Sequence, residues 1–263
     1  GDCWRSFPHD HARSRAYRWG EDGLLGLCDR EARLCFALSL WNGRDPILKE
    51  RLFGLSNPEG NHGEDVKELY YYLDATPGGE YLKALYKYPL AEFPYGRLVA
   101  ENGARSKRQG EFELLDTEAL AEGHVDVQVE YAKAAEDDIL VRVTLTLRGD
   151  ARATVHLLPT LWFRNTWSWG GGYEHDWGKP SLRREGDAVV ATHATLGTYR
   201  LDAEGADTWV FTENETNRAR LWGVGNPSPY VKDAFHRWRI EGDRDAVNAA
   251  ETGTKAAASY ALA

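Results

Sequence analysis

The sequence predicts a mainly β protein, a large antiparallel β-sandwich with a few short helices, and three observations favour this fold class. Apolar and polar residues alternate with a period of two over long stretches, which is typical of strands with one wet face. Many such segments follow one another at intervals of about 8–12 residues, a spacing typical of sandwiches and barrels. No internal period recurs, which disfavours a propeller or a solenoid. We therefore predict a single β-sandwich domain over residues 1–263.

The first half of the chain is predicted to combine strands with short helices. Two apolar runs joined by a charged loop indicate a hairpin, Gly23–Cys28 with Leu34–Trp41. Two further strands are predicted at Ile47–Phe53 and in the tyrosine-rich segment Glu68–Asp74. Two short helices, each limited by a proline, are predicted at Tyr81–Tyr88 and Phe93–Asn102.

The second half carries the clearest strand pattern. Alternation is strong from Val125 to Tyr131 and again over Leu140–Leu147, and a third strand is predicted at Ala153–Phe163. Shorter strands are predicted at Ala188–His193, Thr198–Asp202, Trp209–Thr212 and Arg218–Trp222. Helical spacing appears only over Tyr230–Trp238. The last residues, Ser259–Ala263, alternate like the middle of a strand, so we expect the chain to be part of a longer polypeptide.

Charge and hydropathy exclude several classes of partner. The net charge of −9 argues against nucleic acid and against an anionic membrane, because both attract clustered Lys and Arg. No apolar run approaches the roughly 20 residues that cross a bilayer. The cysteines Cys3, Cys28 and Cys35 form no disulfide framework. Cys28 and Cys35 flank a turn and would face each other across a hairpin, and we predict two buried thiols in a reducing, cytoplasmic compartment.

Paired carboxylates are candidates for general acid and base chemistry; hydrolysis of a glycosidic bond, for example, needs two carboxyl groups about 5–10 Å apart. The candidate pairs are Glu64/Asp65, Asp137/Asp138, Glu174/Asp176 and Glu213/Glu215. Carboxylates two residues apart share a face only on a strand, whereas adjacent ones point apart. Asp137/Asp138 and Glu213–Thr216 are predicted to be exposed turns. No residue of the chain is therefore assigned a catalytic role.

Metal, nucleophile and cofactor chemistry find little support in the sequence. His9 and His11 would project together on a strand, but spacing anchors no third ligand. We expect these side chains to form hydrogen bonds near Arg13, Arg15 and Arg18 instead. The chain has no Gly-x-Ser-x-Gly, no phosphate-binding glycine loop and no Cys-x-x-Cys. We predict neither a metal site nor a cofactor.

Two glycine-rich stretches are dense in polar and aromatic residues, Gly60–Glu68 and Leu161–Tyr173. An indole face packs against the C–H groups of a pyranose, and amide, guanidinium and carboxylate groups hydrogen-bond its hydroxyls. The same residue types also favour packing in a core or against another domain, which is the interpretation we prefer. The candidate substrate or interdomain contacts are Asn61, His62, Glu64, Asp65, Arg164, Asn165, Trp167, Trp169 and Tyr173.

Several long segments of the sequence are specific enough to indicate a resemblance to a known protein family. The segment FPHDHARSRAYRWGEDG over residues 7–23 resembles the early part of large bacterial glycoside hydrolase family 63 proteins, of the glucosidase or mannosyl-oligosaccharide glucosidase-like type. The resemblance spans nearly the whole chain. It continues at residues 40–43 (LWNG), 48–55 (LKERLFGL), 60–68 (GNHGEDVKE), 86–89 (YKYP), 157–169 (LLPTLWFRNTWSW) and 253–256 (GTKA).

The resemblance implies an N-terminal β-sandwich that precedes a catalytic (α/α)6 barrel of the same polypeptide. Family members invert the anomeric centre with a general acid and a general base that lie on the barrel. The implied substrates are α-glucosides or related oligosaccharides, with no cofactor. This chain has no run of long amphipathic helices to form a barrel, so we expect the domain alone to be inactive although the parent protein is a glycoside hydrolase.

Two alternatives remain open from the sequence. The chain is an autonomous carbohydrate-binding module if its tryptophans form a flat, exposed strip. It is a complete enzyme if it contains an acid pair that the pattern does not reveal. The exposure of Trp162, Trp167 and Trp169 distinguishes a domain that docks on the catalytic barrel from an autonomous binding module. A docking domain is expected to have a discontinuous apolar surface surrounded by charged residues.

Overall fold

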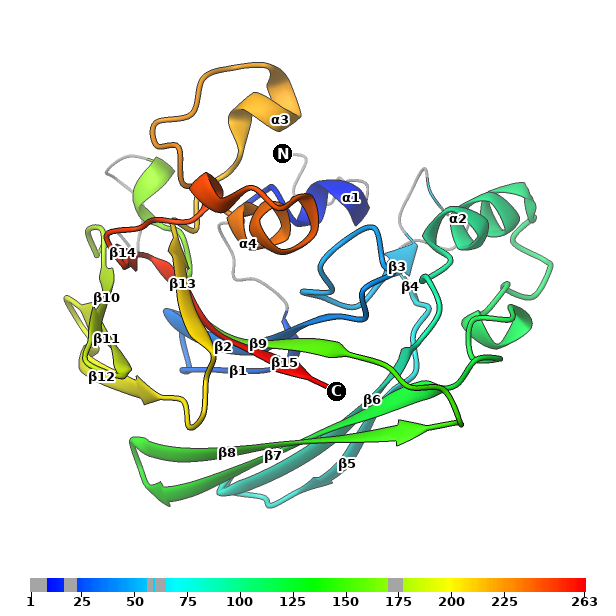
Figure 1. Cartoon of the computed structure of the whole chain (residues 1–263), viewed down its shortest axis with the longest axis horizontal. Helices are drawn as coiled ribbons and strands as arrows, with labels where there is room; N and C mark the ends of the chain where they lie inside the picture. Colours follow the sequence, from blue (N-terminus) through cyan, green and yellow to red (C-terminus); the bar gives the residue numbers. More distant parts are fainter. Residues whose placement is uncertain (1–8, 17–22, 56–58, 60–64, 170–176) are drawn as a thin grey trace. The chain divides into compact units, whose positions relative to one another are not determined.

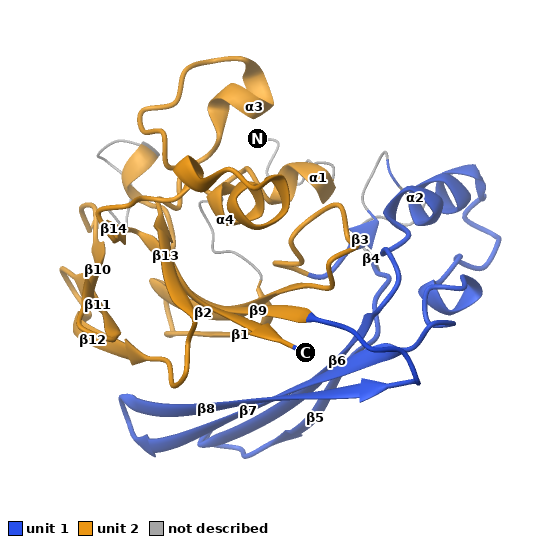
Figure 2. Ribbon diagram, in the orientation of Figure 1, with its two compact units in different colours: residues 1–8, 52–154, 263 blue, residues 9–51, 155–262 orange. Residues whose placement is uncertain are grey.

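The protein is described from a computed structural model covering residues 9–16, 23–55, 59, 65–169 and 177–263. It is mainly β, with antiparallel sheets and a few short helices, as the sequence predicts (Figure 1). The chain divides into two compact units, residues 1–8, 52–154 and 263 in unit 1 and residues 9–51 and 155–262 in unit 2 (Figure 2). The single domain expected over residues 1–263 stays a prediction.

Unit 2 contains two antiparallel sheets. The first has five strands in the order β1 (Leu24–Cys28), β2 (Leu34–Trp41), β9 (Val155–Phe163), β15 (Lys255–Leu262) and β13 (Thr208–Thr212). The second has four, in the order β12 (Gly197–Asp202), β11 (Ala188–His193), β10 (Ser181–Glu185) and β14 (Thr252–Gly253). The short helices of this unit are α1 (His9–Ala12), η2 (Trp167–Trp169), α3 (Arg218–Trp222), α4 (Ala234–His236), η3 (Arg237–Glu241) and η4 (Arg244–Ala246).

The two sheets of unit 2 pack face to face as a β-sandwich. Buried side chains from both sheets form one apolar cluster, with Phe163 and Phe211 from the five-stranded sheet against Leu182 and Val189 from the four-stranded sheet. Burial of this apolar area is the main favourable contribution to folding of the unit. The predicted β-sandwich is thereby confirmed.

The opposite face of the five-stranded sheet is covered as well. Phe235 and Trp238, from α4 and the π-helical turn η3, pack with Leu158, Val210 and Ala257 of the sheet. Strand β15 therefore lies between two apolar layers. This arrangement explains its run of alanines, since Ala256 and Ala258 join the sandwich core while Ala257 joins the helical layer, and all three are fully buried.

Unit 1 is built on a four-stranded antiparallel meander. Its strands are β5 (Tyr70–Ala75), β6 (Tyr81–Pro89), β7 (His124–Ala135) and β8 (Asp138–Arg148), and β3 (Gly54–Leu55) pairs separately with β4 (Asp65–Val66). A separate apolar cluster surrounds the helix α2 (Tyr95–Ala104) and the 3-10 turn η1 (Leu114–Asp116). Inside it the buried Asn102 amide donates to the Leu98 and Phe112 carbonyls and accepts the Phe112 N–H.

Three sequence-based predictions of elements are wrong. Tyr81–Tyr88 is strand β6, because Tyr86 and Tyr88 are buried on one face while the intervening residues lie on the other. Ile47–Phe53 contributes only the single bridge of Lys49 to Leu40. Arg218–Trp222 is the helix α3, since the Asn217 side chain caps its N-terminus and Gly223 ends it in the left-handed region.

Cys28 and Cys35 lie directly opposite each other in the β1–β2 hairpin, as the sequence predicts. Cys35 is buried but Cys28 is exposed, so the expectation of two buried thiols is wrong for Cys28. A hydrogen bond with the Cys35 thiol lowers the pKa of Cys28 to about 7. A substantial fraction of Cys28 is therefore thiolate at neutral pH.

We expect Ala257→Leu to lower the free energy of unfolding by about 1–3 kcal/mol, because extra methylenes overfill a core that is packed from both sides. Chemical denaturation of the purified chain measures the loss. Ala261→Leu is the matched control, since Ala261 is on the same strand but exposed, and we expect a change within about 0.5 kcal/mol. Equal losses in the two variants would contradict the double burial of β15.

Mild oxidation is expected to join Cys28 to Cys35, because directly opposed strand residues lie within the Cα separation of about 4.4–6.8 Å that disulfides span. The Cys28 thiolate attacks a small-molecule disulfide and releases one thiol, and the Cys35 thiol then displaces the second. The rate should fall as the pH drops below about 7, since the thiolate is the nucleophile.

Peptide mapping by mass spectrometry in a Cys3→Ser background detects this bond, and Cys28→Ser should abolish it. Recovery of only mixed disulfides with the oxidant would show that the two sulfur atoms cannot meet.

Candidate functional site

The topology of the five-stranded sheet brings three distant segments to one edge. Strand β15 is antiparallel to both β9 and β13, so the carboxyl ends of β9 and β13 lie beside the start of β15. At this edge Thr254 accepts a backbone hydrogen bond from Phe163 and donates one to Thr212. A Cβ at Gly253 would collide with the Thr212 carbonyl, so glycine permits this close approach. The segments that leave the edge are 164–169 and 213–217.

Two buried asparagines fix these segments to each other. The Asn214 side-chain amide donates to the Phe163 carbonyl at 3.0 Å, and its backbone N–H donates to Thr254 Oγ1 at 2.8 Å. The Asn165 amide donates to the Asn214 carbonyl at 2.8 Å and to Ser168 Oγ at 2.9 Å. Asn165 is 1% exposed. The Asn165 amide thus joins the two segments, and its role as a substrate or interdomain contact stays a prediction.

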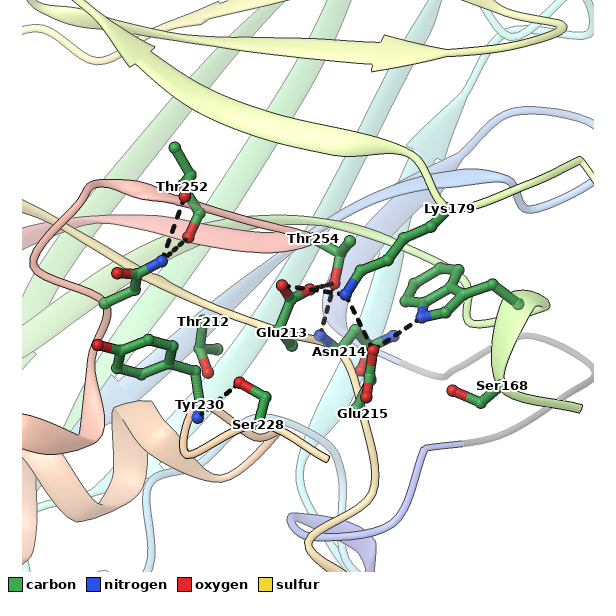
Figure 3. Close-up of polar contacts among 12 residues, drawn as sticks. Ser168, Lys179, Thr212, Glu213, Asn214, Glu215, Ser228, Tyr230, Thr252 and Thr254 are labelled. Carbon is green, nitrogen blue, oxygen red and sulfur yellow. Dashed lines mark hydrogen bonds and ion pairs between the residues drawn. The ribbon is translucent and has the colours of Figure 1, made fainter. Parts of the chain in front are cut away.

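Glu213 and Glu215 form a pair of carboxylates around one ammonium group (Figure 3). Residues two apart in an extended segment share a face, which brings both side chains to the same partner. Lys179 Nζ lies 3.1 Å from Glu213 Oε1 and 3.1 Å from Glu215 Oε1. The two carboxylate side chains are only 17% and 13% exposed. The prediction of an exposed turn at 213–216 is wrong for these two side chains.

Neighbouring donors hold each carboxylate in place. Thr254 Oγ1 donates to Glu213 Oε2 at 2.7 Å, and the Trp167 indole N–H donates to Glu215 Oε1 at 2.9 Å. Burial alone would lower the pKa of Lys179, but the two carboxylates raise it above its ordinary value. The Lys179 ammonium therefore stays charged at neutral pH. The cluster has one more negative charge than positive, and each carboxylate has both an ion pair and a hydrogen bond.

Cations cover the aromatic faces near this edge. Lys179 Nζ lies 6.0 Å from the centre of the Trp167 ring. The Trp177 ring has two guanidinium groups near it, those of Arg33 and Arg164, each 5.6 Å from its centre. Arg164 also donates to the Glu31 carbonyl at 3.0 Å. Arg164 and Trp167 are thus placed at the edge by contacts within unit 2.

The structure accounts for the remaining candidate residues as follows. Asp65 belongs to β4 and Trp169 to η2, and Trp162 is buried. The exposed turn expected at Asp137/Asp138 is confirmed. Outside the described residues lie Asn61, His62, Glu64, Tyr173, Glu174 and Asp176.

Sequence reasoning missed Lys179 and Trp177. Both lie in the segment before β10, a strand that the sequence analysis also missed because SLRRE buries only Leu182. No short motif connects residue 179 with residues 213 and 215. The spacing of Glu213 and Glu215 was the one available signal for this cluster. It indicated that the two side chains point the same way, but it did not identify the cation between them.

His9 and His11 lie on the short helix α1, where residues two apart do not share a face. Within the described ranges, no group of three or more His, Cys, Asp or Glu side chains is arranged to hold a metal ion. No described helix is both long enough and apolar enough to cross a membrane.

Comparison with known proteins gives one informative match. No protein-family model matches the chain, and no solved structure matches it. The chain is similar to Uncharacterized protein YMR196W of Saccharomyces cerevisiae (strain ATCC 204508 / S288c), with 41% identity over 296 aligned residues. The match covers 99% of this chain and 27% of the yeast protein. The chain therefore spans about a quarter of the length of the curated relative it matches.

Removing the central cation is expected to destabilise the edge. Lys179→Gln should lower the free energy of unfolding by about 1 kcal/mol at pH 7, because Glu213 and Glu215 then repel each other without a shared partner. Thermal unfolding measures the change. Adding Glu215→Gln to this variant should restore part of the loss by removing the repulsion. A double variant less stable than Lys179→Gln would show that Lys179 does not act by screening the pair.

Proposed function

We propose that the chain is the non-catalytic β-sandwich domain of an inverting glycoside hydrolase of family 63, acting on α-glucosides or related oligosaccharides. The catalytic centre would lie on an (α/α)6 barrel of the same polypeptide, with no cofactor. The long strings that resemble this family support the proposal. The length of the yeast relative also supports it, since that protein extends far beyond the region matched by this chain.

The observation that carries the proposal is that neighbouring donors already bind both carboxylates of the Glu213/Glu215 pair. An inverting hydrolase needs one carboxyl group that protonates the leaving oxygen and one that activates a water. Here one ammonium bridges both carboxylates, and Thr254 and Trp167 donate to them. Carboxylates held by one ammonium and by donors from other segments fit a structural role at this edge.

The aromatic residues support a docking edge over an autonomous carbohydrate-binding module. A module needs open, coplanar rings for stacking on sugars, whereas Trp162 is buried and the rings of Trp167 and Trp177 lie beside cations. Tryptophan and arginine at a charged rim are typical of domain interfaces. We therefore propose that Arg164, Trp167 and Lys179 contact the barrel and help to shape its substrate entrance.

The proposed location is the cytoplasm. Cys28 and Cys35 are present as thiols although they lie opposite each other in a hairpin, which fits a reducing compartment.

Hydrolysis of an α-linked glucose disaccharide tests the proposed function. The purified chain should release no glucose, whereas the complete polypeptide should release it with inversion at the anomeric carbon. Turnover by the chain alone, abolished by Glu64→Gln or Asp65→Asn in a variant that remains folded, would overturn the proposal. Isothermal titration with gluco- and manno-oligosaccharides tests the alternative of an autonomous carbohydrate-binding module. Saturable heat from the chain alone at millimolar ligand would favour that module.

A further inference from the structure

Strand β8 forms one edge of the four-stranded sheet of unit 1 (Figure 1). It pairs with β7 in an unbroken register from Ile139 to Arg148, and no described strand pairs with its other side. The outer side of an edge strand carries a row of backbone N–H and C=O groups that can pair with a further strand. β8 has 11 residues, so this row is about twice as long as in an average strand.

The two edges of this sheet differ in how well they are protected. The opposite edge, β5, has only six residues, and its pairing with β6 is irregular between Tyr72 and Asp74. Short length and bulges both discourage an edge from pairing with another chain. β8 contains neither Lys nor Pro, and its register with β7 has no irregularity after Ile139. β8 is therefore the edge at which a further strand fits.

The side chains of β8 form the exposed margin of an apolar face. Ile139, Val141 and Leu147 lie on one face of the strand and are 40%, 38% and 43% exposed. Val143 and Leu145 lie on the same face and are half-buried. The β7 residues opposite the four positions from 141 to 147 are buried, so the apolar face continues inward from this margin. A continuous exposed apolar margin indicates an interaction surface.

The sequence of β8 is complementary to itself. When a second copy of the strand runs antiparallel with the two-fold axis at Val143, each Asp138 lies opposite the Arg148 of the second copy. In the same register the apolar residues all lie on one face of the joined sheet, at positions 139, 141, 143, 145 and 147 of both copies. Opposite charges at both ends and apolar residues between them favour this pairing.

The neighbouring registers are disfavoured by like charges. A two-fold axis one residue earlier places Arg142 opposite the Arg142 of the second copy. An axis one residue later places Asp138 opposite Asp150. Like charges that lie directly opposite each other across strands are destabilising. The charges of this segment therefore select the register centred on Val143.

Both charged groups are available for the pairing. Asp138 is exposed, and its carboxylate makes no ion pair or hydrogen bond within the described ranges. The Arg148 side chain is 58% exposed and donates through Nε to Asp126 Oδ2 at 2.7 Å. A guanidinium has five N–H donors, so the terminal nitrogens of Arg148 remain for a second carboxylate. Exposed ion pairs add little affinity, but they determine register and partner.

We propose that β8 is a dimerisation edge, at which two copies of this chain pair β8 with β8 and join their four-stranded sheets. A two-fold contact uses the same strand of both copies, so assembly closes at two. The surface belongs to unit 1 and shares no residue with the edge at 164–169 and 213–217. Failure of this proposal therefore leaves the proposed function untouched, and the tests of the two are independent.

Sedimentation velocity over a range of concentrations tests the proposal. The purified chain should form a dimer with a dissociation constant below about 100 μM, and the complete polypeptide should dimerise as well. Asp138→Arg should weaken the dimer at least about tenfold, because it replaces two attractive pairs with Arg148 by two repulsive ones. Asp137→Arg is the matched control, since it makes the same charge change opposite the uncharged Gly149, and its affinity should stay within about threefold.

Oxidative cross-linking tests the register. In a Cys3→Ser/Cys28→Ser background, Val143→Cys should give a disulfide-linked dimer, because residues directly opposite each other across strands lie within disulfide range. Ile139→Cys is the control on the same face, since its two copies would lie about 27 Å apart and should not cross-link.

Three results would overturn the proposal. The first is a chain that remains monomeric at about 100 μM or grows beyond a dimer. The second is equal weakening by Asp138→Arg and Asp137→Arg, or equal cross-linking at positions 139 and 143. The third is a monomeric complete polypeptide in which the β8 amides exchange slowly with deuterium, since another domain would then cover this edge.

Discussion

The burial of β15 on both faces is the constraint on which the rest of unit 2 depends. Ala256 and Ala258 contribute to the core between the two sheets, and Ala257 contributes to the layer under Phe235 and Trp238. Because β15 is antiparallel to both of its neighbours, it also determines which loops meet at each edge of the sheet. The edge cluster follows from this topology, since Thr254 lies just before β15 and hydrogen-bonds to Glu213. Packing and site geometry therefore share one cause.

The sequence predicted the elements whose pattern depends on local burial. β7 alternates between buried and less buried residues, and the hairpin of β1 and β2 has a charged loop between apolar runs. β8 alternates in sequence, although most of its side chains are exposed. It failed where tertiary context decides the outcome. β6 lacks β-branched residues and resembles a short helix until pairing with β5 and β7 separates its buried tyrosines from its lysines. The helix α3 is specified by its end signals, the Asn217 cap and the left-handed Gly223, because five residues are too few to show a helical period.

The candidate site was predictable only in part, for a physical reason. Trp167 and the Glu213/Glu215 alternation stand out in the sequence, but Lys179 joins them only through the fold. Asn165 looked like a ligand contact because its polar–aromatic surroundings suit sugars and interfaces equally. Its burial shows that the same residue type also stabilises sheet edges by completing backbone hydrogen bonds.

The central claim is that the edge at residues 164–169 and 213–217 docks a further domain of the same polypeptide. Hydrogen–deuterium exchange of the chain alone and of the complete polypeptide tests this claim most directly, because amides at a docked edge open less often. The account predicts slower exchange at these two segments in the complete polypeptide, with exchange in β11 and β12 unchanged. Identical exchange at 164–169 and 213–217 in the two proteins would contradict it.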